Sequence, residues 1–152
     1  MLFQNYGLFW QADKVKWGSK GKNNQGSLDG VWASAKREGF VDFREQRGIY
    51  VLYDDTFRII YVGQAGRGQR CLFARLKDHM RDDLAGRWTK FSWFGTRPVN
   101  DRYELEDSKK ITPSLAEVLN HLEAILIAAA EPPLNRQGGK FGRAEKYLQR
   151  TD

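Results

Sequence analysis

The clearest pattern in the chain is a pair of β-branched and aromatic runs near its middle. Residues 48–53 (GIYVLY) and 57–62 (FRIIYV) are separated by 54–56, a segment with the composition of a turn. Both faces of each run are largely apolar, which predicts a β-hairpin covered on two sides, as in a layered α/β fold. With a two-residue turn, Tyr50 would lie directly opposite Tyr61 on one face of this hairpin.

Helical spacing of apolar residues predicts two helices after the hairpin. Residues 72–84 have apolar side chains on one helical face, and Gly86 follows their end. A longer helix is predicted to begin at Thr112-Pro113 and to end before the two prolines at 132–133. Residues 90–94 (KFSWF) between the helices predict a third strand. The apolar positions of the longer helix predict a strongly buried element; they are Leu115, Val118, Leu119, Leu122, Ile125, Leu126 and Ala129.

The ends of the chain give weaker patterns. We expect a short strand around 13–17, a short helix over 28–38 and a final short helix after residue 142. Residues 18–27, rich in glycine, lysine and polar side chains, predict a flexible basic loop. The sequence therefore predicts an N-terminal extension over 1–46 and a main domain over 47–152. That domain is expected to be an α/β (α+β) sandwich with a three-stranded antiparallel sheet flanked by helices.

Composition places the chain among ordinary globular proteins. Its 152 residues suffice for one domain, and 41% are hydrophobic and 29% charged. No apolar run approaches the roughly 18 residues of a membrane span, so no membrane partner is expected. The first ten residues lack the basic and long apolar parts of a signal peptide. One cysteine, Cys71, excludes an internal disulfide and a multi-cysteine zinc site, so we expect a reducing, cytoplasmic location.

Positive charge is concentrated in the middle of the chain. The net charge is +6, and residues 47–100 carry ten basic against five acidic side chains, whereas 101–134 carry three against seven. This distribution suits a phosphate-rich partner, although a solvated basic surface gives the same pattern. The glycines at 63, 66 and 68 have the wrong spacing for a Walker loop or a dinucleotide-binding loop, which argues against a nucleotide site.

An ordered set of short motifs surrounds the hairpin. Gly48-Ile49-Tyr50 is followed, with ten residues between the two tyrosines, by Tyr61-Val62-Gly63. This pair resembles the signature of the GIY-YIG nuclease superfamily, with valine in place of the usual isoleucine. Further residues follow in the order of that family, and with the hairpin they cover residues 47–137: Arg75 and His79 one turn apart in the predicted first helix, Glu123 in the second helix, and Asn135 after the two prolines.

The resemblance implies an endonuclease that hydrolyses DNA phosphodiester bonds by a one-metal mechanism. It implies that Tyr50 activates the attacking water and that Tyr61 positions this water or contacts the scissile phosphate. Arg75 would stabilise the transition state, with His79 assisting. Glu123 would hold one Mg²⁺ or Mn²⁺ ion, and Asn135 would help to form the metal or phosphate environment.

The residue types fit this chemistry, but each also has a plainer interpretation. A phenol has a pKa near 10, so a tyrosine base at neutral pH needs cations nearby, and Arg75 is the candidate. A carboxylate among the apolar neighbours of Glu123 is costly unless it binds a metal or forms a salt bridge, and both readings stay open. The plainer readings of the others are core tyrosines, an exposed Arg75, a His79 that caps the apolar stripe, and a turn residue at position 135.

Specificity has to come from outside these motifs. Candidate nucleic-acid contacts are Arg67 and Arg70 after the hairpin and Lys14, Lys16, Lys20 and Lys22 near the N-terminus, although a solvated linker explains the lysines equally well. His121 and Cys71 are expected to be structural. DNA is the expected partner, with RNA as an alternative, and a homodimer or a partner protein is a possible source of specificity. The competing functions are a non-catalytic nucleic-acid-binding module on the same scaffold and a repair nuclease for branched or single-stranded DNA.

Overall fold

The structure is a computed structural model that describes residues 2–19, 25–34, 37–66, 70–130 and 144–151. The described strands are β1 (Asn5–Gln11), β2 (Asp29–Trp32), β3 (Val41–Asp42), β4 (Gly48–Tyr53), β5 (Ile59–Ala65), β6 (Lys90–Gly95) and β7 (Glu145–Gln149). The described helices are the 3-10 turn η1 (Ala12–Lys14), α1 (Leu72–Asp78) and α2 (Leu115–Ala130).

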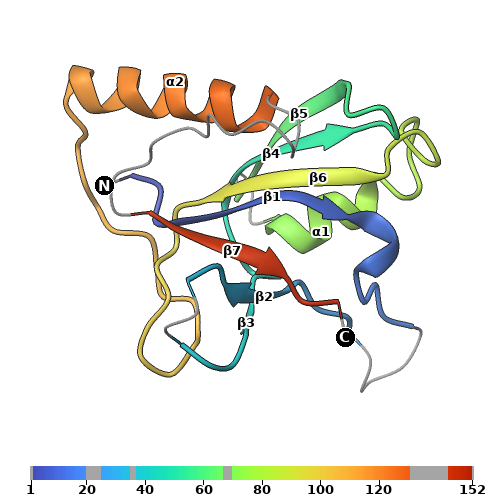
Figure 1. The fold of residues 1–152 in the computed structure, drawn as a ribbon, viewed down its shortest axis with the longest axis horizontal. Coiled ribbons are helices and arrows are strands. Elements are labelled where there is room, and N and C mark those ends of the chain that lie inside the picture. Colours follow the sequence, from blue (N-terminus) through green and yellow to red (C-terminus); the bar gives the residue numbers. More distant parts are fainter. Residues whose placement is uncertain (1, 20–24, 35–36, 67–69, 131–143, 152) are drawn as a thin grey trace.

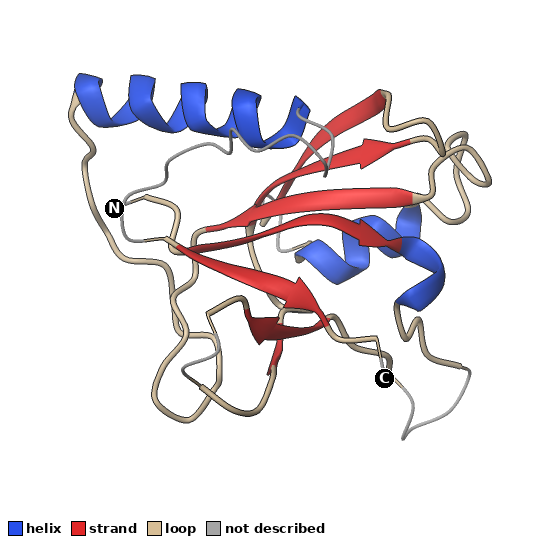
Figure 2. Ribbon diagram, in the orientation of Figure 1, coloured by secondary structure: helices blue, strands red, loops and turns tan. Residues whose placement is uncertain are grey.

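All seven described strands join one mixed sheet in the order β3-β2-β7-β1-β6-β4-β5 (Figures 1 and 2). β1 and β7 are parallel, and the other neighbouring pairs are antiparallel. The mixed α/β class is confirmed, but the expected three-stranded sheet is wrong. The predicted hairpin and third strand are β4, β5 and β6, and four further strands extend the sheet beyond β6. Three of those strands come from residues 1–46, so the sheet crosses the boundary expected at residue 46.

The strands missing from the prediction have weak local patterns. β1 contains an irregularity between Gly7 and Trp10, where Phe9 has a φ of 56°, and this interrupts the alternation that marks a strand. The helices expected over 28–38 and after 142 are wrong, because these segments form β2 and β7. Both strands pair with partners far away in the sequence, and such pairing leaves little trace in the local pattern.

The two α-helices pack on opposite faces of the sheet, as Figure 1 shows. β4 supplies both cores because its side chains alternate: Tyr50 and Leu52 face α1, whereas Val51 and Tyr53 face α2. The prediction that the hairpin is covered on two sides therefore holds for β4. It fails for β5, which is the edge strand and leaves Val62 exposed.

The buried face of α2 differs from the expected one. Small residues turn inward, with Ala124, Ala128 and Ala129 beside Ile125, and the Tyr53 hydroxyl donates a hydrogen bond to the Ala129 carbonyl at 2.5 Å. Alanines let the helix approach a sheet whose aromatic side chains already fill the space between them. The leucines predicted to be buried lie on the outer face instead; these are Leu115, Leu119, Leu122 and Leu126.

Across the described ranges, neither α-helix combines the length and hydropathy that a membrane-crossing helix requires.

Candidate active site

The two motif tyrosines lie on the same face of the sheet but are not directly opposite each other. In the β4–β5 pair Tyr50 faces Gly63, and Tyr61 faces Leu52. Tyr50 and Tyr61 are therefore diagonal neighbours, with ring centroids 6.1 Å apart. The predicted direct pairing is wrong by two positions, although the shared face is as expected.

The shift in register has two sources: the turn between the strands is longer than two residues, and the pairing has an irregularity between Leu52 and Tyr53. The Asp54 carboxylate accepts hydrogen bonds from the backbone N–H groups of Thr56 and Arg58, at 2.9 and 3.0 Å. Phe57 adopts a φ of 64°, and its N–H reaches back to the Asp54 carbonyl at 3.2 Å. An aspartate that satisfies several backbone donors in this way stabilises an extended turn.

Both motif glycines stand where another backbone or side chain comes too close for a Cβ atom. A Cβ at Gly63 would overlap the ring and hydroxyl of Tyr50. Gly48 has a φ of 141°, and a Cβ there would overlap the carbonyl oxygen of Phe94 on β6. The glycine at position 63 therefore makes room for the Tyr50 phenol on the neighbouring strand.

Helix α1 brings an imidazole and a guanidinium to these phenols. His79 is the C-cap of α1, one turn after Arg75, and its Nε2 lies 2.7 Å from the Tyr50 hydroxyl. The centroid of its ring is 4.7 Å from that of Tyr61. Tyr50 has no exposed surface and His79 has 4%, whereas Tyr61 and Arg75 are partly exposed. The structure thus brings together four of the six predicted site residues.

Arg75 is the cation of this cluster. Burial works against its charge, but the nearby Tyr50 and Tyr61 phenols and Asp78 outweigh that effect and raise the pKa of the guanidinium. Its Nε is buried and has no hydrogen-bond partner among the described residues. A buried donor without an acceptor costs free energy. Because this atom is buried, an anionic ligand from solvent would meet the partly exposed remainder of the Arg75 side chain.

The environment of Tyr50 keeps its phenol protonated. Burial raises its pKa to about 12, and the charge of Arg75 offsets only part of this shift. At pH 7 the phenolate fraction is then about 10⁻⁵, because each pH unit below the pKa lowers it tenfold. Tyr50 is therefore a poor free base, and its protonated hydroxyl can donate to His79 Nε2 when that nitrogen carries no proton.

The sequence analysis missed one member of the cluster. Oδ2 of Asp82 lies 2.7 Å from His79 Nδ1, the ring nitrogen that faces away from Tyr50. Hydrogen bonds from the Leu84 backbone N–H and from His79 lower the pKa of the Asp82 carboxyl, which is therefore ionised at neutral pH. The available signal was an aspartate three residues after a histidine, just beyond a helix end.

Glu123 does not join this cluster, and the predicted convergence is wrong for this residue. It is exposed on α2, whose neighbouring Ala124 and Ile125 pack on the face of the sheet opposite Tyr50. Its carboxylate therefore avoids the costly burial that suggested a metal ligand. Asn135 lies outside the described residues.

The described residues around the phenols do not fit a magnesium site. Within the described ranges, no three His, Cys, Asp or Glu side chains gather into a group that could hold a metal ion. The carboxylate of Asp82 is hydrogen-bonded to His79 and to the Leu84 backbone. Mg²⁺ can be held by one or two carboxylates with waters and substrate phosphates, but both oxygens of the Asp82 carboxylate already accept hydrogen bonds.

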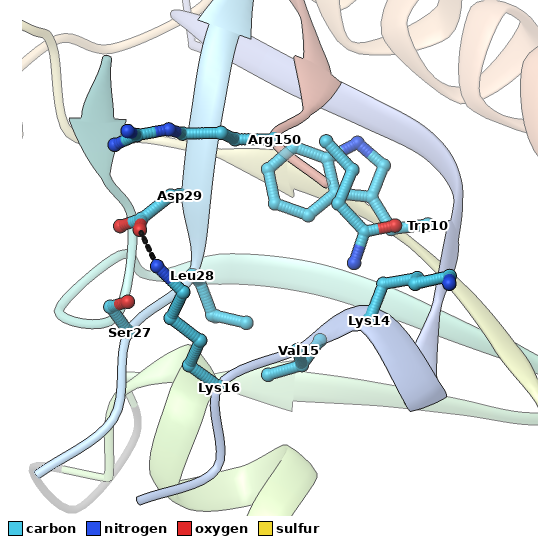
Figure 3. Close-up of a pocket in the computed structure, with 9 residues that line it drawn as sticks. Trp10, Lys14, Val15, Lys16, Ser27, Leu28, Asp29 and Arg150 are labelled. Carbon is cyan, nitrogen blue, oxygen red and sulfur yellow. Dashed lines mark ion pairs between the residues drawn. The ribbon is translucent and has the colours of Figure 1, made fainter. Parts of the chain in front are cut away.

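Two of the predicted nucleic-acid contacts, Lys16 and Arg70, already form ion pairs with acidic side chains. Lys16 forms a 3.8 Å ion pair with Asp29 and lines a small pocket together with Lys14 (Figure 3). Arg70 forms an ion pair with Asp78 on α1. Three other candidates, Arg67, Lys20 and Lys22, lie outside the described residues.

His121 and Cys71 were expected to be structural, and neither belongs to the cluster around the phenols. His121 is buried on α2, with its ring 5.5 Å from that of Phe3. Cys71 is the N-cap of α1 and is partly buried. Both positions fit a role in packing.

No protein-family model matches the chain, and no curated protein and no solved structure matches it either. The function therefore has to be argued from the chemistry of the cluster, which holds two phenols, an imidazole with a carboxylate behind it, and a guanidinium.

Proposed function

We propose that this protein is an endonuclease that hydrolyses DNA phosphodiester bonds at the cluster of Tyr50, Tyr61, Arg75 and His79. The observation that carries the proposal is the buried 2.7 Å hydrogen bond between the Tyr50 hydroxyl and His79 Nε2, placed next to a guanidinium. A nucleophile or proton donor bonded to a base is the recurring core of hydrolytic sites. The guanidinium selects an anionic substrate, and the phosphodiester is the anion implied by the motif resemblance.

Arg75 is the residue that receives the scissile phosphate. Its planar, permanently charged side chain can donate two parallel hydrogen bonds to phosphate oxygens, and the side chain is partly exposed. Negative charge on these oxygens grows as the attacking water adds to phosphorus. A fixed donor aimed at such developing charge contributes about 10²- to 10³-fold to the rate.

The phenols and the imidazole carry the proton of the attacking water. Tyr50 has no exposed surface, so the partly exposed Tyr61, which interacts with it, is the residue that meets the water. As the water oxygen bonds to phosphorus, its proton passes to the Tyr61 oxygen, the Tyr61 proton passes to Tyr50, and the Tyr50 proton passes to His79 Nε2. The P–O3′ bond then breaks on the side opposite the attacking water, the departing 3′ oxygen takes a proton from solvent, and His79 returns its extra proton to solvent. The products are a 5′-phosphate and a 3′-hydroxyl, and every protein group regains its starting state.

The predicted Mg²⁺ or Mn²⁺ ion has no step in this scheme. The resemblance implies one ion held by Glu123, but that residue lies across the sheet from the phenols. Metal dependence is thus a separate expectation with its own test. If a metal contributes through Glu123, the Glu123→Ala variant loses cleavage, whereas the position of this residue predicts parental rates.

A cleavage panel tests the function. Supercoiled, linear, single-stranded and branched DNA and an RNA of matched sequence are each incubated with the parent protein in Mg²⁺ and in EDTA, beside His79→Gln and Glu123→Ala. The proposal expects strand scission by the parent and a loss of about 10²-fold or more in His79→Gln, the range of general acid–base catalysis. Intact substrates bound equally well in EDTA would establish the binding-module alternative and end the proposal.

The same panel separates the remaining options. Preference for branched or single-stranded DNA would assign a repair-type activity, and scission of RNA alone would change the substrate class. We propose the cytoplasm as the compartment. Sequence specificity is expected to depend on a second copy or a partner protein, because Lys16 and Arg70 are already in ion pairs with Asp29 and Asp78.

A further inference from the structure

Asp82 is a residue to which the motif resemblance assigns no role, and it ends the hydrogen-bonded chain that begins at Tyr50. His79 stands between them, with Nε2 2.7 Å from the Tyr50 hydroxyl and Nδ1 2.7 Å from Asp82 Oδ2. We propose that Asp82 is a positioning residue that fixes the tautomer of His79, so that Nε2 is the atom that takes the Tyr50 proton. This inference rests on the proposed function.

The chemistry of the carboxylate assigns the tautomer. An ionised carboxylate can only accept hydrogen bonds, so the ring proton of neutral His79 must lie on Nδ1, which faces Asp82. The other oxygen of Asp82 accepts the Leu84 backbone N–H at 2.9 Å, and this bond holds the side chain in place. His79 Nε2 is then an unprotonated nitrogen directed at Tyr50, and the Tyr50 hydroxyl is the donor.

Other titratable or charged groups around the His79 ring do not supply this function. Tyr61 from β5 packs its ring at 4.7 Å, and Arg75 from α1 is a cation that disfavours a second positive charge nearby. Trp88 donates its indole N–H to the backbone carbonyl of His79 and leaves the ring nitrogens alone. Among the described residues, Asp82 is the carboxylate in contact with the ring, so it offsets the charge of the imidazolium that forms when the Tyr50 proton arrives.

The position of Asp82 lets its role be separated from folding. Its side chain is 43% exposed, in the turn that follows α1, so its replacement removes little buried surface. In Asp82→Asn the oxygen can keep the Leu84 bond, which directs the amide NH₂ at His79 Nδ1. A donor in place of an acceptor favours the opposite tautomer, with the proton on Nε2 and no acceptor left for Tyr50. The exposed neighbour Asp83 provides a matched control, Asp83→Asn.

The experiment combines nitrogen NMR of the histidine ring with single-turnover cleavage. The chain has two histidines, so a His121→Gln variant assigns the His79 signals. We expect the parent and Asp83→Asn to carry the neutral-ring proton on Nδ1 and to cleave equally. Asp82→Asn should move the proton to Nε2 and lower the cleavage rate about 10²-fold, with substrate affinity and melting temperature unchanged. Asp82→Glu, which retains an acceptor, should restore the Nδ1 proton and part of the rate.

Each outcome decides the inference. An unchanged tautomer in Asp82→Asn, or a changed tautomer with parental cleavage, would overturn it while the parent's own cleavage leaves the proposed function standing. A parent that cleaves none of the substrates would refute the proposed function, and a tautomer change in that case would leave Asp82 as a structural partner of His79 with no part in catalysis.

Discussion

The pH dependence of cleavage distinguishes His79 from Tyr50 as the group that finally takes the proton. The pKa of Tyr50 is raised to about 12, mainly by burial. Forming its free phenolate at pH 7 would therefore cost about 7 kcal/mol, at roughly 1.4 kcal/mol per pH unit. If that phenolate were the base, the rate would rise tenfold per pH unit throughout the accessible alkaline range. If His79 accepts the proton, the reaction does not need the Tyr50 phenolate, and the rate becomes independent of pH well below the range in which Tyr50 titrates.

The assay is a single-turnover cleavage rate measured from about pH 6 to about pH 10, with substrate in the DNA form that the panel identifies. The account expects a plateau at the alkaline end of this range in the parent, because the pKa of Tyr50 lies near 12. Tyr50→Phe, which keeps the ring but cannot pass a proton, should lower the plateau at every pH without moving it. A rate that still climbs with unit slope at about pH 10 would refute the assignment of His79 as the acceptor.

Three further predictions concern packing. Gly63→Ala places a Cβ against the hydroxyl of Tyr50, so it should displace the phenol, lower cleavage and cost about 1–3 kcal/mol of unfolding free energy, measured by urea denaturation; a fully active variant would contradict the packing. Ile125→Ala should cost about 2–4 kcal/mol and the adjacent Leu126→Ala less than about 0.5, because 8% and 69% of these residues are exposed, and the reverse order would mean that α2 presents its other face to the sheet. Burial raises the pKa of Tyr53 from 10.0 to about 12, so the buried phenol stabilises the fold fully below pH 10 and loses this stabilisation as the pH rises toward 12. The free energy of unfolding should therefore fall over that window, and Tyr53→Phe should make the fall shallower by about 1.4 kcal/mol per pH unit.

Local sequence patterns predicted the part of the fold that carries the phenols. The dense β-branched and aromatic runs form β4 and β5, and the helical spacing after them forms α1. Because α1 follows β5 after a short connection, Arg75 and His79 lie near the two strands, and the sequence analysis placed these four residues together correctly. The hairpin register was wrong because the Asp54 side chain stabilises a longer turn and the pairing is irregular between Leu52 and Tyr53, neither of which a count of residues reveals.

Longer-range features were not predictable in the same way. β1 and β7 form through pairing between chain ends, and neither has a clear alternation of its own. Helix α2 has two apolar faces, one of leucines and one of alanines with Ile125, and only the surface of the sheet decides which is buried. Because the alanine face of α2 is the buried one, Glu123 is exposed. Asp82 escaped notice because its contact with His79 depends on the geometry of the turn after α1.

The most direct test of the central claim is the cleavage rate of Arg75→Ala compared with that of Arg81→Ala, both measured on the same DNA under single-turnover conditions. Arg81 is an exposed arginine in the turn after α1. Its replacement by alanine changes the net charge by the same amount as Arg75→Ala. The account predicts that Arg75→Ala loses about 10²- to 10³-fold in rate, as expected for a donor that stabilises transition-state charge, while Arg81→Ala cleaves like the parent. Parental cleavage by Arg75→Ala would contradict the assignment of this cluster as the active site.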